Sequence, residues 1–525
     1  MKADDLREAY LSFFESKGHT RYPSDSLVPA NDPTLLFTGA GMNQFKEMFL
    51  GIGNLPFSRA VTSQKCFRTG DLDNVGRTYY HQTFFEMLGN FSYGDYFKRE
   101  AIEWQWEFLT RVLGIPAEKL WVSVYLDDDD AYAIWRDVVK IPERKIWRLD
   151  AKENFWPANA PEDGPNGPCG PCSEIFFDFG SPGEEGDPEA ARYCEIGNIV
   201  FTQFNRTGVN QLDPLGRENI DTGMGFERIL AVLNGVRSNF ETELFLPLIR
   251  AIAEIAGDTY TYEHPLGQQY RRIAEHARAA VFLVADGVKP SNEGRGYVAR
   301  RVIRRAVRDG IALGIERPFL HELVDVVVAL MGKAYPETRT AQEAARTFLR
   351  AEEEKFRSTY ETGMALLDRE LAALDGKSLP GETAFVLYDS HGFPFELCAE
   401  ICLERGVEVD REGFEHCMEA QRERSREGSS MGGEVFVATA ITGIKKTVPP
   451  TEFLGYESEQ ARSTVAVVIL GEQPVEVISE SDGETRLIAA ATPFYAESGG
   501  QIGDTGLIEG PHGRFRVTDT RKLDD

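Results

Sequence analysis

The sequence has 525 residues, which is too long for a single hydrophobic core and predicts about three domains. It has 42% hydrophobic and 27% charged residues, no run of about 18 apolar residues and no apolar N-terminal stretch, so a membrane span and a secretion signal are excluded and a cytoplasmic protein is expected. The 84 acidic against 57 basic residues give a net charge of −27, which argues against nucleic-acid binding by the surface as a whole.

Residues 1–232 mix helix and strand patterns. Leu6, Tyr10, Phe13 and Phe14 share one face of a first helix that Gly18 is placed to end, and a second helix is expected at 97–113. Strands are expected at 35–37, 84–88, 120–126, 174–179 and 198–204. No glycine-rich loop joins a strand to a helix, so any nucleotide site differs from a P-loop or a dinucleotide fold.

Residues 233–433 are predicted to be mostly helical, with 3.6-residue periodicity at 271–285, 300–313, 319–331 and 340–374. From Lys289 to Arg308 there are seven basic residues and one acidic residue, a local charge of +6. Five of them form a basic stripe along one predicted helix: Arg300, Arg304 and Arg308 recur every four residues, with Arg301 and Arg305 beside them. Because the stripe has no acidic partner in this window, we expect Arg300, Arg304 and Arg308 to bind RNA phosphates.

Residues 427–433 have the composition of a linker, and the periodicity changes to two from residue 434 onward. The segments 475–481 and 484–490 flank Asp482-Gly483, which predicts a hairpin. Residues 434–525 therefore form a separate all-β module. This module ends without a clear domain boundary, and we expect the chain to be part of a longer protein.

Four segments resemble conserved motifs of one known family. They are residues 31–37 with 41–46, 65–68 with 83–91, 167–174, and 221–228. In this order they resemble the alanyl-tRNA synthetases, a family of class II aminoacyl-tRNA synthetases. The resemblance implies an α+β fold: an antiparallel sheet flanked by helices (1–232, adenylation), a helical tRNA-recognition domain (233–433) and a barrel-like part of an editing domain (434–525).

The implied activity is that of an alanine–tRNA ligase. Such an enzyme uses ATP with Mg²⁺ to make alanyl-adenylate and pyrophosphate, and then transfers alanine to the 3′ end of tRNA(Ala). The attacking carboxylate is already an anion, so the site must supply alignment and positive charge, which arginine provides in a planar fork. By resemblance, Arg68 binds the α-phosphate and Arg228 the γ-phosphate as the catalytic residues, and Phe85 stacks on adenine. The implied ATP-binding residues are Arg68, Gln82, Phe85, Trp156, Ile196, Gly197, Asn198, Gly225 and Arg228.

The resemblance also implies how alanine would be held. Asp221 is assigned to the ammonium group, Asn198 and Trp156 to the carboxylate, and Trp156 and Val200 to the methyl group, with Gly223 leaving room. From the residues alone, Asp221 has a second interpretation as the N-cap of a helix that follows Thr222-Gly223, and it could serve both roles.

For tRNA, the resemblance implies that Asn292 and Asp389 recognise the G·U pair of the tRNA(Ala) acceptor stem. Residues 494–501 resemble the opening of the editing domain, whose zinc site uses a His-x-x-x-His pair with later Cys and His ligands. After residue 434 this chain has His512 and no cysteine, so we expect no editing, and zinc only in the editing domain of a full-length protein. Cys169 and Cys172 lack a second ligand pair, and we expect a structural turn there and no metal. The seven cysteines are expected to be reduced thiols.

Three departures from the family pattern affect single contacts. The loop after Arg68 is short and lacks a lysine, Gln82 replaces the second of two histidines and leaves His81, and Gly197 stands where a tryptophan is common. The alternatives are an adenylating ligase for another small acid and a catalytically dead RNA-binding paralogue. Retention of Arg68 and Arg228 argues against the paralogue. A free-standing editing protein is excluded by the missing His-x-x-x-His pair.

Overall fold

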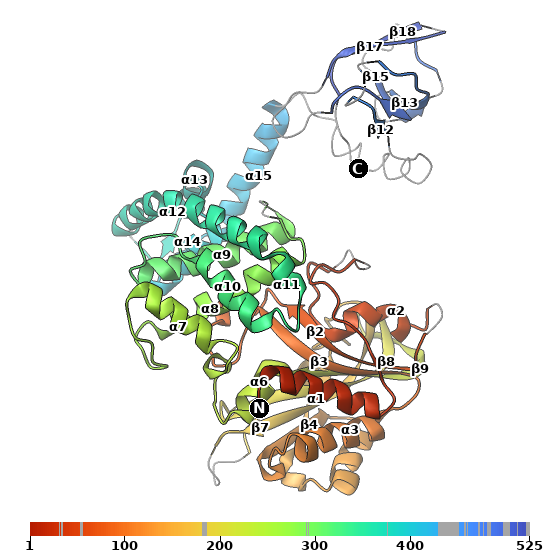
Figure 1. Ribbon diagram of the computed structural model, residues 1–525, viewed down its shortest axis with the longest axis vertical. Helices are drawn as coiled ribbons and strands as arrows, with labels where there is room; N and C mark the ends of the chain where they lie inside the picture. Colours follow the sequence, from red (N-terminus) through yellow and green to blue (C-terminus); the bar gives the residue numbers. More distant parts are fainter. Residues whose placement is uncertain are drawn as a thin grey trace. The chain divides into compact units, whose positions relative to one another are not determined.

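A computed structural model gives the architecture of the chain in two compact units, Met1–Leu366 and Leu367–Asp525 (Figure 1). The structure describes residues 1–525 except 31, 33–34, 53–55, 181–185, 189, 290, 292, 375, 429–450, 456–457, 459, 471–472, 476, 480–484, 497–503, 512 and 521–525. Residues 1–232 and 233–366, which the sequence analysis assigns to separate domains, lie together in the first unit. The three-part division stays a prediction.

The first unit is built on a nine-stranded sheet in the order β1-β2-β3-β9-β8-β7-β4-β5, with β6 paired to β7. All neighbours from β2 to β4 are antiparallel, and only β1–β2 and β4–β5 are parallel. The strands are β1 Thr20–Arg21, β2 Arg59–Phe67, β3 Phe84–Tyr93, β4 Leu120–Tyr125, β5 Ile146–Leu149, β6 Phe155–Trp156, β7 Gly167–Asp178, β8 Tyr193–Gly208 and β9 Gln211–Gly225.

Four of the five expected strands lie in this sheet, within β3, β4, β7 and β8. The expected strand at 35–37 is wrong, because these residues form bends and not a strand. Of this apolar run only Phe37 is buried, and its ring lies 4.7 Å from the Phe67 ring of β2, whereas Leu36 is exposed.

One face of the sheet is covered by α1 (Ala3–Ser16) and α3 (Lys98–Glu107). The amphipathic pattern of α1 buries Tyr10 and Phe14, and the Tyr10 hydroxyl donates to Asn90 Oδ1 of β3 at 2.8 Å. The π-helical turn Phe108–Val112 extends α3, so the helix expected at 97–113 is present. The helix predicted to end before Gly18 does so, and Gly18 has a φ of 86° that suits glycine.

Helices of residues 226–366 pack at one end of the sheet in Figure 1. They are α6 Phe226–Leu233, α7 Leu246–Ala256, α8 Gly267–Ala285, α9 Gly294–Ala312, α10 Leu320–Met331, α11 Glu337–Thr340 and α12 Gln342–Ala372, the last crossing into the second unit. The four predicted helices correspond to α8, α9, α10 and α12. None of the described helices is long and apolar enough to cross a membrane.

The second unit begins with helices and ends in small sheets. Its helices are α13 Gly381–His391, α14 Phe395–Glu404 and α15 Arg411–Gly428, and a short parallel pair joins β10 Ser378–Leu379 to β11 Glu408–Val409. The later strands are β12 Glu452–Phe453, β13 Val465–Leu470, β14 Gln473–Val475, β15 Thr485–Ala489, β16 Ala491–Thr492, β17 Gly506–Gly510 and β18 Gly513–Val517.

The hairpin expected between 475–481 and 484–490 is wrong in its pairing. Both β14 and β15 pair with β13, which lies between them. The run Val465–Leu470 is the most apolar of the three, so it takes the central position. Asp482-Gly483 lie outside the described residues. The expected fold class is confirmed: an antiparallel sheet flanked by helices, a helical region, and small sheets near the end of the chain.

Candidate active site

Strand register brings most of the expected site residues to one face of the sheet, which we call the site face. Asp221 of β9 is opposite Val200 of β8 and Phe91 of β3, and Gly223 is opposite Asn198 and Gly89. Because alternate residues of a strand point to the same side, these residues share one face. The glycines leave this part of the face without side chains. At Gly223 there is little room for one, because a Cβ there would lie 2.9 Å from the Met87 sulfur.

Asp221 is a strand residue and not a helix N-cap. The strand β9 continues to Gly225, which is itself the N-cap of α6, so the N-cap interpretation is wrong. Asp221 is only 5% exposed, and no hydrogen bond or ion pair to its carboxylate is found among the described residues. Burial without a partner raises the pKa of Asp221 to about 7.

Asn198 and Glu174 lie next to Asp221 and Val200 across the sheet. The Asn198 Nδ2 donates to Glu174 Oε1 at 3.2 Å, whereas the buried Oδ1 has no donor among the described residues. Burial, and then the negative charges of Glu195 and Glu153, raise the pKa of Glu174 well above its ordinary value. The site face thus holds buried acceptors that lack donors, an arrangement suited to a cation.

The two adjacent phenylalanines at the start of β3 have different environments. Phe84 is fully buried and its ring stacks on Phe282 of α8 at 4.1 Å. Phe85 is half-buried, and the Arg68 guanidinium carbon lies 5.1 Å from its ring centroid. Arg68 is exposed, its Nε donates to Gly39 O at 3.0 Å, and it lines a pocket with Phe37 and residues 69–71. Phe85 is therefore the phenylalanine that remains accessible.

Arg228 lies in the first turn of α6, where the chain leaves the sheet after Gly225. Its Nη1 donates to the backbone oxygen and to the carboxylate of Glu195, both at 2.8 Å. Its guanidinium carbon is 4.7 Å from the Tyr80 ring centroid. The nearby charge of Glu195 raises the pKa of Arg228 against the opposing effect of burial, so the side chain stays charged.

Trp156, Ile196 and Gly197 are brought close to this face. Trp156 pairs with Gly170 of β7 and packs against an apolar cluster that contains Phe91. Ile196 is fully buried. A side chain at Gly197 would collide with the sulfur of buried Met224, so Met224 fills the space beside Gly197.

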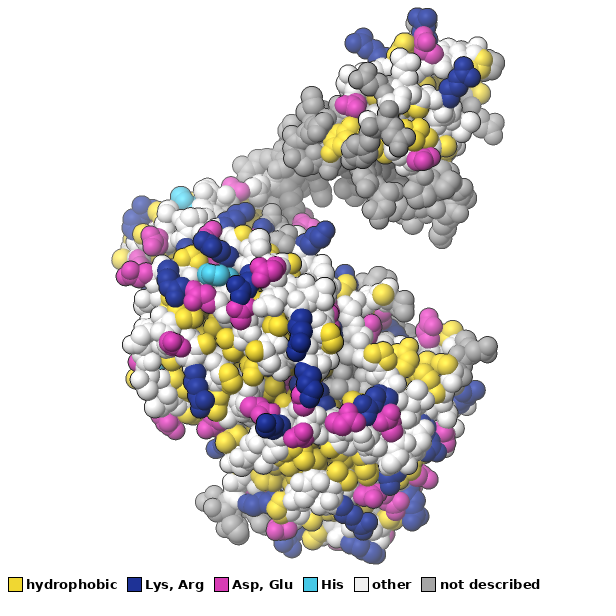
Figure 2. Space-filling view, in the orientation of Figure 1, with side chains coloured by type: hydrophobic (Ala, Val, Ile, Leu, Met, Phe, Trp, Pro, Cys, Tyr) yellow, Lys and Arg dark blue, Asp and Glu magenta, His cyan; other side chains and the backbone are white. Residues whose placement is uncertain are grey.

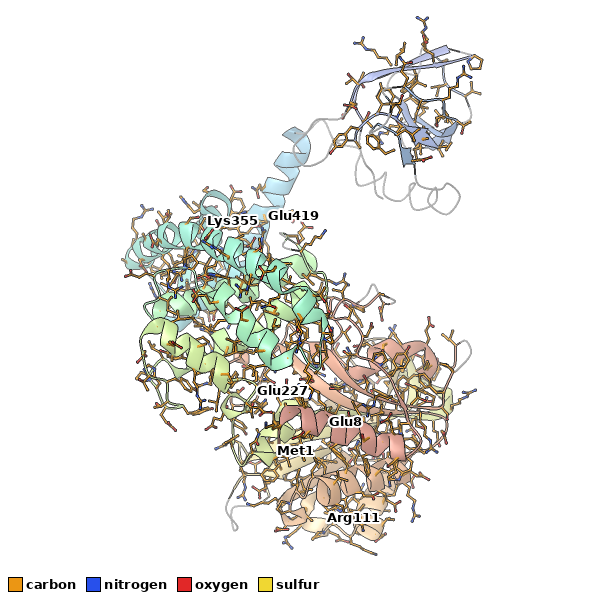
Figure 3. All side chains as sticks on the ribbon, in the orientation of Figure 1. Met1, Glu8, Arg111, Glu227, Lys355 and Glu419 are labelled. Carbon is orange, nitrogen blue, oxygen red and sulfur yellow. The ribbon has the colours of Figure 1, made fainter. Side chains whose placement is uncertain are left out.

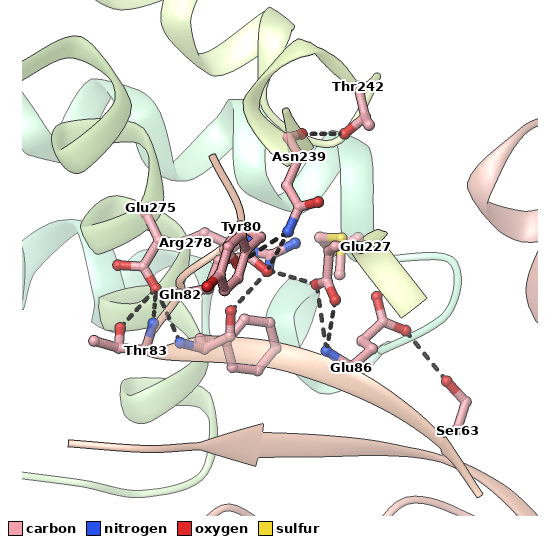
Figure 4. A network of polar contacts seen from close by, with 12 residues as sticks. Ser63, Tyr80, Gln82, Thr83, Glu86, Glu227, Asn239, Thr242, Glu275 and Arg278 are labelled. Atoms are coloured by element: carbon pink, nitrogen blue, oxygen red, sulfur yellow. Dashed lines mark hydrogen bonds and ion pairs between the residues drawn. The ribbon is translucent and has the colours of Figure 1, made fainter. Parts of the chain in front are cut away.

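Gln82 does not lie on the strand that carries Phe85; it precedes β3 and is buried (Figure 4). Its Oε1 accepts from Asn239 Nδ2 at 3.4 Å, and its Nε2 has no partner among the described residues. The short loop after Arg68 is fastened to the helices: Arg305 donates to Asp73 at 2.5 Å and Arg271 to Gly76 O at 3.1 Å.

The basic stripe of α9 has acidic partners, and the expectation that it has none is wrong. Arg300 pairs with Glu352 of α12 at 3.2 Å, and Arg301 and Arg305 pair with Asp73. The guanidinium carbon of Arg304 lies 5.7 Å from the Phe356 ring centroid. These partners are distant in sequence, which is why the local window failed to reveal them. On the face shown in Figure 2, basic side chains of the first unit are interspersed with acidic ones.

Of the two residues expected to read the acceptor stem, only Asp389 is described. It lies near the end of α13 in the second unit, is exposed, and accepts a hydrogen bond from Gln421 Nε2 of α15. Asn292 lies outside the described residues. The expected turn at Cys169–Cys172 is instead a bulge in β7, where Gly170 lets the strand approach Phe201 O. No group of three or more metal-ligand side chains is found in the described part of the chain.

Several polar residues around the site were missed by the sequence analysis. They are Tyr80, Glu195, Glu275 and Arg278. A signal existed for the last two: Glu275 and Arg278 are charged residues three positions apart, directly before the apolar run Ala279–Ala285. A charged pair at helical spacing on a buried face needs partners from another element.

The comparisons with known proteins agree with this architecture. A family profile described as "tRNA synthetases class II (A)" matches residues 5–525. The chain belongs to this family. This class II synthetase chain is 50% identical to the alanine–tRNA ligase of Chromohalobacter salexigens over 535 residues, which cover 99% of this chain and 59% of that protein.

Two further relatives are similar to the same extent. The alanine–tRNA ligases of Thermus thermophilus and Neisseria meningitidis are 47% and 49% identical, over 100% of this chain and 61% and 60% of their own lengths. The class II synthetase chain therefore spans about three fifths of the curated relatives it matches. Apo histidyl-tRNA synthetase from S. aureus aligns at a TM-score of 0.28 and 12% identity over 46% of this chain and 70% of that chain, which adds nothing to the assignment.

Proposed function

We propose that the chain is an alanine–tRNA ligase that activates alanine with ATP and transfers it to the 3′ end of tRNA(Ala). The observation that carries this proposal is the buried carboxylate of Asp221, which has no donor among the described residues and lies on a glycine-lined sheet face near Asn198. A small ammonium compound supplies the missing donors. The relatives of about 50% identity are named alanine–tRNA ligases, which supports alanine as the amino acid.

The amino acid would be held by charge and by size. The Asp221 carboxylate would accept from the alanine ammonium group. The Asn198 Oδ1, unpaired among the described residues, can only accept, so it would also face the ammonium group, which revises the expectation that Asn198 holds the alanine carboxylate. Val200 and Trp156 would surround the methyl group, and Gly223 would leave room for it because its missing side chain faces Met87. A pocket of this kind discriminates poorly against one extra hydroxyl or one missing methyl, since such differences are worth about 1–3 kcal/mol.

Arg68 and Arg228 would bind the phosphates of ATP. Arg68 is exposed over Phe85, and it would hold the α-phosphate while Phe85 stacks on adenine. Arg228 would hold the γ-phosphate with its charge retained by Glu195. The alanine carboxylate attacks the α-phosphorus, pyrophosphate leaves, and no side chain has to remove a proton. The arginines stabilise the charge that spreads over the phosphate oxygens.

Mg²⁺ fits the carboxylates beside Arg228. Burial, and after it the negative charge of Glu195, raise the pKa of Glu174, and a cation would relieve the repulsion between the two carboxylates. Magnesium keeps several waters and uses one or two carboxylates together with substrate phosphates, so Glu174 and Glu195 would hold it without a larger cluster. When bound, it would neutralise part of the phosphate charge.

The second unit would supply tRNA recognition, with Asp389 accepting from the exocyclic amine of guanine in the G·U pair. Asn292 would read the same pair, and Arg300, Arg304 and Arg308 would contact phosphates where their partners leave them accessible. Protein synthesis would place this activity in the cytoplasm. Zinc would belong to the editing part of the longer relatives.

Alanine-dependent ATP–pyrophosphate exchange tests the proposal. We expect exchange with alanine, weaker exchange with serine and glycine, and loss of about 10²-fold or more in Arg68→Ala and in Arg228→Ala, because each removes charge stabilisation in the transition state. Lys65→Gln serves as a control, because this lysine pairs with Asp286 and Glu337 and is not among the residues proposed to bind the phosphates.

The same assay separates the alternatives. An adenylating ligase for another small acid would give exchange with that acid and none with alanine. A catalytically dead paralogue would give no exchange with any amino acid while the folded chain still binds tRNA.

A further inference from the structure

A buried polar network joins Glu275 and Arg278 of helix α8 to Thr83 and to Glu227 (Figure 4), which are close in the chain or by hydrogen bond to Arg228 and Arg68. The network begins at Glu275, whose Oε1 accepts from the Thr83 backbone N–H and hydroxyl, both at 2.6 Å, and from the Phe84 N–H at 2.9 Å. The Thr83 carbonyl in turn accepts from the Arg68 backbone N–H at 2.8 Å. Two hydrogen bonds, with Thr83 between them, therefore connect Glu275 to the backbone of Arg68.

Arg278 makes the second connection, one helical turn further along the same face of α8. Its Nη2 donates to the Phe84 carbonyl at 2.8 Å and to Glu227 Oε1 at 2.6 Å. Glu227 precedes Arg228, and its carboxylate also accepts from the Glu86 N–H of β3. Figure 3 shows Glu227 where the helices meet the sheet.

The network is buried and tightly packed. Arg278 has no exposed surface, Glu227 is 2% exposed, and the guanidinium carbon lies 4.4 and 4.9 Å from the ring centroids of Phe245 and Phe84. A buried charge with one partner is held firmly, because losing that partner leaves an uncompensated charge. Small changes in α8 would therefore displace Phe84 and Glu227 together.

We propose that Glu275 and Arg278 are positioning residues for the ATP site: from one helix they fix the Thr83–Phe84 backbone beside Arg68 and Phe85, and the start of α6 beside Arg228. Neither residue touches the nucleotide. The inference rests on the proposed function for the identity of the ligand. It follows that ATP binding depends on how α8 packs, whereas alanine binding at Asp221 and Asn198 depends on it less.

Arg278→Gln tests this, with Arg272→Gln as the matched control. Arg272 lies on the same helix and is equally buried, but it pairs with Asp309 of α9 at 2.5 and 2.6 Å. Both variants should unfold at lower urea concentration. Only Arg278→Gln should raise the KM for ATP in exchange by about tenfold or more, with the KM for alanine changed less than about twofold. ATP affinity measured by calorimetry should fall in parallel.

Glu275→Gln provides a second variant, because it keeps the shape of the side chain and weakens its hydrogen bonds with Thr83 and Phe84. It should show the same shift for ATP, and Arg278→Lys should recover part of the ATP affinity. Equal ATP constants in Arg278→Gln and Arg272→Gln, or equal shifts for ATP and alanine, would overturn the inference. If Arg278→Gln does not fold, an unchanged KM for ATP in Glu275→Gln overturns it. Absence of exchange in the unmodified chain would instead refute the proposed function, and calorimetry would then still test the network.

Discussion

At the scale of single residues, the site face holds buried polar groups that lower the stability of the ligand-free protein and that a ligand would pair with. Asp221 is a carboxylate with 5% exposure and no partner among the described residues, and this costs free energy that only a bound cation would recover. Asn198 Oδ1 likewise has no donor in the part of the chain that the structure describes. Such groups are typical of binding sites and rare in ordinary cores.

Asp221→Asn should therefore stabilise the ligand-free protein. The pKa of Asp221 is raised from 3.8 to about 7, so the stabilisation from its protonated form is complete at low pH and is lost as pH rises toward 7. The difference in the free energy of unfolding between Asp221→Asn and the unsubstituted protein should grow between pH 3.8 and about pH 7. It should reach at most about 4 kcal/mol at pH 8, since one pKa unit is about 1.4 kcal/mol. Urea unfolding at pH 4 and pH 8 measures it, and equal stability at both pH values would contradict it.

Gly197 is a second residue whose role depends on a neighbour. Gly197→Ala should destabilise the protein by about 1–3 kcal/mol, because the new Cβ collides with the buried Met224 sulfur. Gly197→Ala with Met224→Ala should recover part of that loss, since the smaller side chain opens the space. Thermal unfolding of the single and double variants checks this, and additive effects of the two substitutions would contradict it.

At the scale of elements, ion pairs between charged residues hold helices and strands together. The basic stripe of α9 forms ion pairs with α12 and with the loop after Arg68, so part of its positive charge is neutralised within the fold. The same holds for Arg7 of α1, whose guanidinium bonds to Glu86 of β3 at 2.6 and 2.7 Å. Charge runs read from sequence alone therefore overstate the surface that is available to RNA.

Arg300→Ala should mainly lower stability. It leaves the Glu352 carboxylate, which is 8% exposed, without this partner, and we expect a cost of about 1–3 kcal/mol. Arg300→Ala with Glu352→Ala should restore part of it, and a double-mutant cycle in urea gives the coupling. A coupling near zero, together with tRNA binding that weakens and loses about one unit of salt dependence, would show that Arg300 binds phosphate instead.

At the scale of the whole molecule, the described residues of the proposed activation site all lie in the first unit, and Asp389 lies in the second. Activation and tRNA reading can therefore be separated by mutation. The relatives are longer than this chain, and residues 434–525 contain one histidine and no cysteine.

Asp389→Ala should lower charging of tRNA(Ala) by about tenfold to a hundredfold and leave pyrophosphate exchange unchanged, because a lost base contact costs about 1–3 kcal/mol. Gln421→Ala is the control, since it removes the same hydrogen bond between α13 and α15. Equal losses of charging in both variants would show that Asp389 acts by holding the helices together.

The chain should leave preformed seryl-tRNA intact, because hydrolysis needs a metal-activated water and its ligands are absent from the sequence after residue 434. Deacylation is followed by loss of acid-precipitable label against a no-protein reaction. A rate above that control that falls on adding a chelator would contradict the expectation.

The sequence by itself determined the elements and the motifs. Periodicity located α1, α8, α9, α10 and α12, and short strand-like runs located parts of β3, β4, β7 and β8, because these patterns follow from local geometry. The order of the motifs pointed to Arg68, Asp221 and Arg228 as a set.

Only the tertiary structure decided which of these residues meet and what else they meet. Register across β3, β9, β8 and β7 brought Asp221, Asn198 and Glu174 together. It made Asp221 a strand residue rather than a helix cap, placed Phe84 in the core, and gave Arg300 and Arg305 acidic partners more than fifty residues away. Pairings at such separation depend on how whole elements pack, and no local pattern encodes them.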